Sequence, residues 1–140
     1  MRSILLFFML VVCFSCSSTK NVKAQANELN GAWVPIYQEL GGKAMADSLY
    51  PQQKLVINDT TYTYTAAPGA VDRGIIKFNG NHMDIYAIEG ANKGRHIPVL
   101  YKYEDGKLTI CYDLADLKYP IEFETKSSPL YFLSVFVRSK

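Results

Sequence analysis

Apolar and polar residues alternate in short runs from Asn30 to the C-terminus, and residues that favour turns separate the runs. Successive side chains of a strand point to opposite faces, so a period of two indicates strands with one face toward a core. Turns at intervals of roughly eight to twelve residues are typical of an all-β barrel or sandwich. The predicted strands are Ala32–Gln38, Lys54–Asn58, Thr61–Thr65, Arg73–Asn79, His82–Glu89, His96–Glu104, Lys107–Asp113, Pro120–Thr125 and Leu130–Arg138.

The connections between these runs support a sheet of sequential hairpins. Asn79-Gly80-Asn81 and Glu104-Asp105-Gly106 contain residues that tolerate positive φ and predict tight turns. A bulge at Asn58-Asp59 would join the second and third strands into one, which leaves eight. Only GKAMADSL, Gly42–Leu49, predicts a helix, which Pro51 prevents from extending. We therefore expect an all-β fold: a single antiparallel up-and-down β-barrel of about eight strands, with one short helix after the first strand.

The same alternation assigns residues to the interior of the barrel. Tyr62 and Tyr64 share one face of TTYTYT, and Ile110 and Tyr112 share one face of LTICY. Tyrosine suits a cavity wall that is apolar yet offers hydroxyl groups, but it is also a good strand former, and most of the ten tyrosines are expected to be ordinary sheet residues. The candidates for lining the barrel are Tyr62, Tyr64, Phe78, Ile85, Tyr101, Tyr112 and Phe123.

The N-terminal segment MRSILLFFMLVVCFSCSSTK lacks this alternation. Arg2 precedes the unbroken apolar run Ile4–Val12. This run is too short to span a bilayer, which takes about 20 apolar residues, but it suits the hydrophobic region of a secretory signal peptide. Ser15 before Cys16 resembles the cleavage site of bacterial lipoproteins, in which the cysteine is acylated and becomes the new N-terminus.

We therefore predict a signal peptide over residues 1–15, lipidation of Cys16, a polar tether over 16–28 and a barrel domain over 29–140. The expected location is the bacterial cell envelope, with the membrane reached through the lipid anchor only. Cleavage after Ala24 or Ala26 would instead release a soluble secreted or periplasmic protein.

Charge and the remaining side chains exclude several classes of function. The net charge is +2, or +1 once Arg2 leaves with the signal peptide, and no long run of like charge marks a nucleic-acid interface. His82 and His96 each begin a separate strand beside a turn, where we expect them to be exposed, and neither belongs to a cluster with the spacing of metal ligands. Cys111, inside a strand, is expected to be a buried, inert thiol. We predict no metal, no cofactor and no catalytic residues.

The loop GANKGR, Gly90–Arg95, superficially resembles a phosphate-binding loop. A P-loop requires G-x-x-x-x-G-K-[ST] followed by a helix, whereas here a predicted strand containing Pro98 follows. We expect a solvated hairpin loop that binds no nucleotide.

Four segments in order resemble a bacterial lipocalin-like domain family of uncharacterised function. They are LNGAWV, the GxxKG of Gly90–Gly94, LYKYEDGKLTIC and YPIEF, where Tyr119 replaces an arginine usual in the family. The resemblance implies a lipocalin-like barrel and an envelope location but no chemistry. Gly31-x-Trp33 resembles the G-x-W of the first lipocalin strand, which implies a structural role: Trp33 closes one end of the barrel and Arg138 covers its ring.

Two functions remain open. A hollow barrel would bind a small apolar or amphipathic ligand, and this requires an interior void of roughly 300 Å³ or more. A filled barrel with a contiguous exposed apolar patch would instead be a protein-interaction or inhibitor module that uses its outer face and loops.

Overall fold

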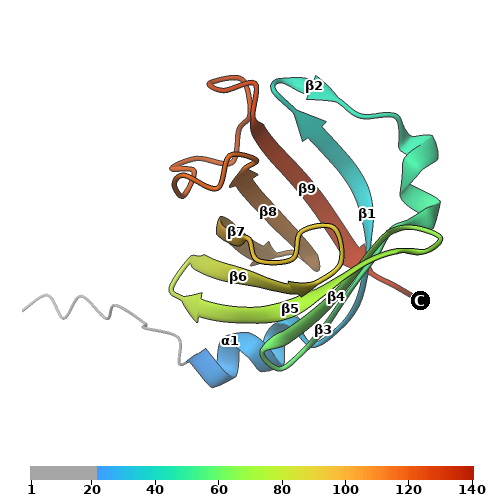
Figure 1. Ribbon diagram of the computed structural model, residues 1–140, viewed down its shortest axis with the longest axis vertical. Coiled ribbons are helices and arrows are strands. Elements are labelled where there is room, and N and C mark those ends of the chain that lie inside the picture. Colours follow the sequence, from blue (N-terminus) through green and yellow to red (C-terminus); the bar gives the residue numbers. More distant parts are fainter. Residues whose placement is uncertain (1–21) are drawn as a thin grey trace, which may run out of the picture.

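The computed structural model describes residues 22–140, which form a closed antiparallel β-barrel of eight strands (Figure 1). Each strand pairs with the next along the chain, and the last pairs with the first, as in an up-and-down barrel. The predicted fold class is thereby confirmed. The barrel strands are β1 (Gly31–Leu40), β3 (Lys54–Asn58), β4 (Thr61–Ala67), β5 (Ala70–Asn79), β6 (His82–Glu89), β7 (His96–Glu104), β8 (Lys107–Asp113) and β9 (Tyr131–Arg138).

The barrel closes through a long pairing of β1 with β9, from Trp33 opposite Arg138 to Leu40 opposite Phe132. The register shifts between Pro35 and Tyr37, where proline has no N–H to donate to the ladder. The opposite edge of β1 pairs with β3 over three residues only. Beyond that point the chain from β1 to β3 covers this edge.

That chain contains the short helix expected after the first strand, but at a different position. The structure has a two-residue strand, β2 (Lys43–Ala44), which pairs with the end of β1, and then a 3₁₀ helix, η1 (Asp47–Gln52). The predicted range Gly42–Leu49 is therefore wrong in its bounds. Gly41 and Gly42 adopt positive φ, which turns the chain back onto β1 before any helix can begin, and Pro51 lies inside the helix rather than beyond it.

Two-residue hairpin loops connect several strands. Asp105 and Gly106 both have positive φ (52° and 74°), as a type I′ turn requires, and Gly80 has a φ of 61° in the predicted Asn79–Asn81 turn. Asp59, at a φ of 52°, begins a tight loop between β3 and β4 rather than the bulge considered above. These two segments are therefore separate strands.

Nine strands were predicted, and β3 and β4 are separate, yet the barrel has eight strands because Pro120–Thr125 is not a strand, contrary to the prediction. β8 and β9 pair directly along their whole length, from Lys107 opposite Val137 to Asp113 opposite Tyr131, so no edge is left for a strand between them. Residues 114–130 instead form an irregular connection. Within it, Thr125 is fully buried and donates a hydrogen bond to Glu39 on β1.

Residues 22–28, placed by prediction in a polar tether, belong to a helix, α1 (Val22–Leu29). Gln25, Ala26 and Leu29 are buried because their spacing places them on one face of the helix. The Gln25 side chain donates to the carbonyl oxygen of Gly80 at 2.6 Å, which ties α1 to the β5–β6 turn. The helix therefore closes one end of the barrel.

The predicted signal peptide and Cys16, the predicted lipidation site, lie outside the described residues. Within residues 22–140, no helix has the length and hydrophobicity needed to cross a membrane.

Candidate functional site

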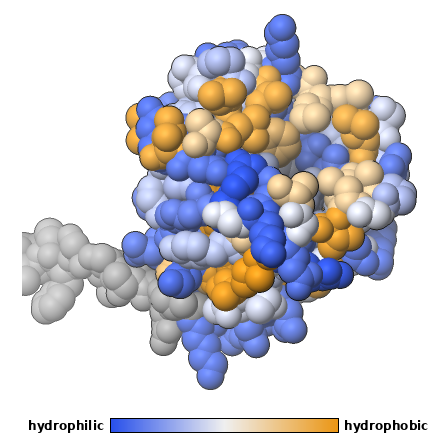
Figure 2. Space-filling model, viewed as in Figure 1, coloured by the Kyte–Doolittle hydropathy of each residue, from blue (hydrophilic) through white to orange (hydrophobic). Residues whose placement is uncertain are grey.

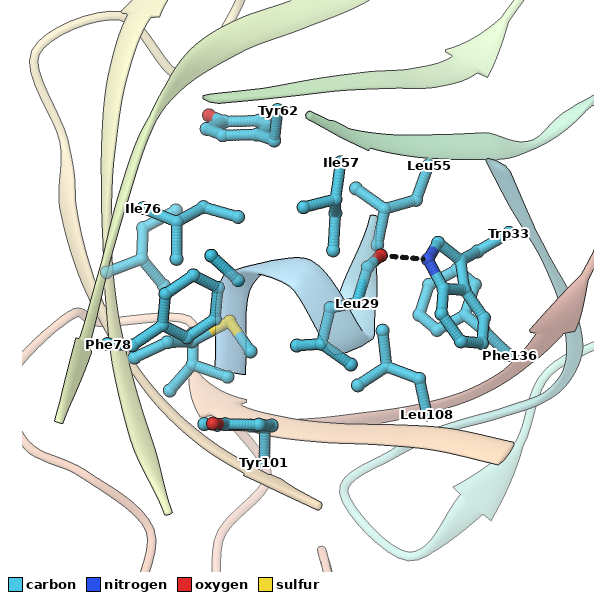
Figure 3. Close-up of a cluster of buried hydrophobic side chains, with 14 residues drawn as sticks. Leu29, Trp33, Leu55, Ile57, Tyr62, Ile76, Phe78, Tyr101, Leu108 and Phe136 are labelled. Carbon is cyan, nitrogen blue, oxygen red and sulfur yellow. Dashed lines mark hydrogen bonds between the residues drawn. The ribbon is translucent and has the colours of Figure 1, made fainter. Parts of the chain in front are cut away.

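The closed end of the barrel is built around Trp33, which is completely buried. Its indole N–H donates to the carbonyl oxygen of Leu29 at 2.9 Å, and Leu29 reaches from α1 into the middle of the barrel (Figure 3). The ring of Tyr103 meets the indole edge to face at 5.6 Å. This end is therefore filled with side chains.

Arg138 covers the indole, in the arrangement that the G-x-W resemblance implies. Its Cζ atom lies 4.4 Å from the centre of the Trp33 ring, within cation–π distance. The guanidinium also donates to the carbonyl oxygens of Glu28 and Asn30 at 2.8 and 2.5 Å, and thereby caps the C-terminus of α1. A Cβ on Gly31 would meet Nη1 of Arg138 at 2.6 Å, which explains the glycine of the motif.

A cavity of about 110 Å³ lies deeper along the interior, toward the end opposite α1. Its wall is largely apolar. Tyr64, Ile85, Ile110 and Tyr112 remain only partly buried although they pack against the core, because their side chains border this space. The apolar lining consists of Leu55, Ile57, Tyr62, Tyr64, Ile76, Met83, Ile85, Ile97, Leu108, Ile110, Tyr112, Phe132 and Phe136.

Of the seven residues predicted to line the barrel, Tyr62, Tyr64, Ile85 and Tyr112 border the cavity. Phe78 and Tyr101 also point inward, but they pack against each other at 5.9 Å in the core cluster that contains Leu29 (Figure 3). They are part of the filled end and do not line the cavity.

Phe123 does not line the barrel, contrary to the prediction. It belongs to the irregular 114–130 connection and contacts the barrel from outside, where the Lys102 ammonium lies 5.0 Å from its ring centre. The alternation in YPIEF resembles that of a strand, but the direct pairing of β8 with β9 excludes the segment from the barrel wall.

The polar residues of the cavity were not predicted. Asp72 lines it from β5 and accepts two hydrogen bonds from Asn92, one from the backbone N–H at 3.1 Å and one from the side-chain amide at 2.6 Å. The signal for Asp72 was present in the sequence. It continues the period-two series of Gly74, Ile76 and Phe78 backward, past the point where we began the predicted strand.

On another side of the cavity, Gln38 forms a buried amide pair with Gln53. Its Nε2 donates to Gln53 Oε1 at 2.7 Å and to the Ser134 hydroxyl at 3.2 Å, and the Tyr64 hydroxyl donates to the same Gln53 oxygen at 2.7 Å. Burial raises the pKa of Tyr64, so this hydroxyl remains a neutral donor. The network fixes the rim of the cavity next to η1.

The loop Gly90–Arg95 is a largely exposed hairpin loop, as expected, and its Asn92 side chain reaches the cavity. Gly90 approaches Asp72 so closely that a Cβ would meet its carboxylate at 2.1 Å, and a φ of 96° also favours glycine there. Arg95 binds Asp116 with two parallel hydrogen bonds of 2.6 and 2.8 Å. This pair, with Asp116 as the main cause, raises the pKa of Arg95 and joins the loop to the 114–130 connection.

Cys111, His82 and His96 do not line the cavity. Within residues 22–140, no group of three His, Cys, Asp or Glu side chains is arranged to hold a metal ion. Cys111 is buried, and burial raises its pKa to about 11, so the thiol is protonated and unreactive. His96 is exposed as predicted, whereas His82 is half-buried because it stacks on Tyr119 at 4.3 Å.

The molecule is therefore a closed up-and-down barrel, filled at one end and holding a small apolar cavity toward the other. Comparisons with protein-family models, with curated proteins and with solved structures found no match.

Proposed function

We propose that this protein is a non-enzymatic lipoprotein of the bacterial cell envelope, and that its lipocalin-like barrel binds a small apolar or amphipathic ligand. The observation that carries this proposal is the cavity. It is enclosed by apolar side chains and bordered by a few convergent polar groups, which is the composition of a small-molecule site. The N-terminal sequence and the family resemblance support the envelope location.

The size of the cavity restricts the ligand. The cavity of about 110 Å³ does not reach the void of roughly 300 Å³ stated above as the requirement for a hollow, ligand-binding barrel, so a drug-sized molecule does not fit. An engineered apolar cavity of about 150 Å³ takes up benzene, so the comparable space here suits one small ring or the end of a longer chain. The rest of an amphipathic ligand would extend past the rim toward solvent.

The test is a titration of the purified protein with benzyl alcohol, followed by amide chemical shifts in NMR. We expect saturable shifts in the strands that border the cavity, and at least tenfold weaker binding in Ile85→Phe, because the added ring occupies the space. Ile88→Phe is the matched control: it adds the same ring to the same strand, but at an exposed position. The absence of saturable shifts, or equal weakening in both variants, would overturn the proposal.

A second candidate rests on a different surface. Leu117 and Ile121 are 81% and 91% exposed, and both border a surface groove in the 114–130 connection that also contains Leu130. Figure 2 shows apolar surface gathered over this connection, at the upper left of the view. Exposed apolar groups of this kind often mark contact sites for a protein partner.

Crosslinking in the native envelope separates the two functions. If this surface binds a protein, Ile121→Lys removes a crosslinked product that the wild-type protein forms. Leu49→Lys, an equivalent change at an exposed leucine on η1, keeps it. A product that both variants retain would argue against this candidate.

A further inference from the structure

Among the residues of the described range 22–140 that line the cavity, Asp72 is the only one with a charged side chain. It is 8% exposed. A buried carboxylate is costly unless hydrogen bonds or an opposite charge compensate it. The groups that compensate the charge of Asp72 therefore indicate which kind of ligand group could bind beside it.

The partners of Asp72 are neutral. Asn92 donates one hydrogen bond to each carboxylate oxygen, and a carboxylate offers about four lone-pair sites. Each oxygen therefore keeps acceptor capacity. The negative charge itself meets no cation among the cavity-lining residues.

Arg95 lies close enough that, after Asp116 as the main cause, the charge of Asp72 contributes to the raised pKa of Arg95, but this arginine is already engaged. Its guanidinium forms the two-bond pair with Asp116 and also donates to the carbonyl oxygen of Leu114 and to the Asn92 side chain. Because Asp116 balances Arg95, the three charged groups leave one net negative charge. That charge affects the cavity wall: burial, and next the charge of Asp72, raise the pKa of Tyr62 to about 12, against a smaller opposing effect of Arg95.

We propose that the ligand of this cavity is an amine, with its ammonium group at Asp72 and its apolar part among the surrounding aliphatic and aromatic side chains. The inference rests on the proposed ligand-binding function and specifies the class of ligand. A negatively charged ligand, such as a fatty acid, would meet Asp72 with like charge in a poorly solvated space and is selected against. A neutral analogue fills the same space without the charge interaction.

The test compares three ligands of similar shape and different charge at pH 7: benzylamine, benzyl alcohol and benzoate. We expect benzylamine to bind the wild-type protein at least tenfold more tightly than benzyl alcohol, and benzoate to bind more weakly than either. Asp72→Asn keeps the size of the side chain and an acceptor oxygen, and it should reduce the amine-to-alcohol ratio to about one. Asp105→Asn, which removes the same charge at the β7–β8 turn, should leave the ratio unchanged.

The outcomes distinguish this inference from the function on which it rests. If none of the three ligands binds, ligand binding itself fails, and the inference with it. If benzyl alcohol binds as tightly as benzylamine, or benzoate binds best, the barrel still binds a small ligand but the amine assignment is wrong. The wild-type comparison decides this even if Asp72→Asn does not fold.

Discussion

Replacing Arg138 with alanine tests whether the closed end of the barrel is stabilised by the cover over Trp33. The change removes the cation–π contact at 4.4 Å, worth about 0.5–1 kcal/mol at an exposed site. It also removes two hydrogen bonds to the carbonyl oxygens of Glu28 and Asn30, worth roughly 0.5–1 kcal/mol each after allowance for their exposure. We therefore expect Arg138→Ala to lower the free energy of unfolding by about 1.5–3 kcal/mol.

Urea denaturation followed by fluorescence measures this change, because Trp33 is the only tryptophan in the chain and is buried in the native state. With a slope of about 1–3 kcal/mol/M for a small protein, the midpoint should fall by on the order of 1 M. Circular dichroism, recorded in parallel, reports whether the whole barrel unfolds in the same transition.

Two further variants provide the comparison. Arg138→Lys keeps the charge but loses the two-donor geometry, so its stability should lie between those of the wild type and the alanine variant. Arg73→Ala breaks an ion pair with Glu89 in which both side chains are more than half exposed, and such pairs contribute about 0–1 kcal/mol. If Arg138→Ala loses no more stability than Arg73→Ala, the cover over Trp33 has no stabilising role.

Two other changes test the close packing of β5 against β6 and the predicted lipid anchor at Cys16. Gly74→Ala should cost about 3 kcal/mol or more in the same urea assay, because a Cβ would lie 2.0 Å from the carbonyl oxygen of Tyr86 and 2.8 Å from the ring of Tyr62. A loss below about 1 kcal/mol would mean that β5 and β6 separate easily. Cys16→Ala should move the protein from the membrane to the soluble fraction of fractionated cells, and unchanged membrane association would contradict lipidation at this residue.

The barrel was predictable because its strands and turns are encoded by short stretches of the sequence. Alternation with a period of two gave the observed bounds of four barrel strands, those of β9 to within one residue, those of β1 and β4 to within two, and those of β5 to within three. Residues able to adopt positive φ marked the tight turns. Trp33 was also predictable, since a motif in the first strand placed it at one end of the barrel. The prediction failed where local pattern and pairing disagree. Pro120–Thr125 alternates like a strand, yet β8 and β9 already occupy each other's edges.

The candidate site was only partly predictable. Whether an inward-facing side chain borders the cavity depends on its position along the barrel axis, which the alternation does not give. Tyr101 and Tyr112 have the same inward orientation in the alternation, but Tyr101 lies in the packed cluster that contains Leu29, whereas Tyr112 borders the open space. Asn92 comes from a loop, and no periodicity indicated that it reaches Asp72.

The amino-acid sequence by itself determined which residues of each barrel strand face the interior, because the pleat of a strand alternates side chains whatever the strand pairs with. It also determined the turns, because few residues tolerate positive φ. Only the tertiary structure decided that α1 fills one end of the barrel and that Asp72 meets Asn92 near the other. Those contacts join segments distant in the chain, and they form only when closure of β1 onto β9 brings the ends of all eight strands together.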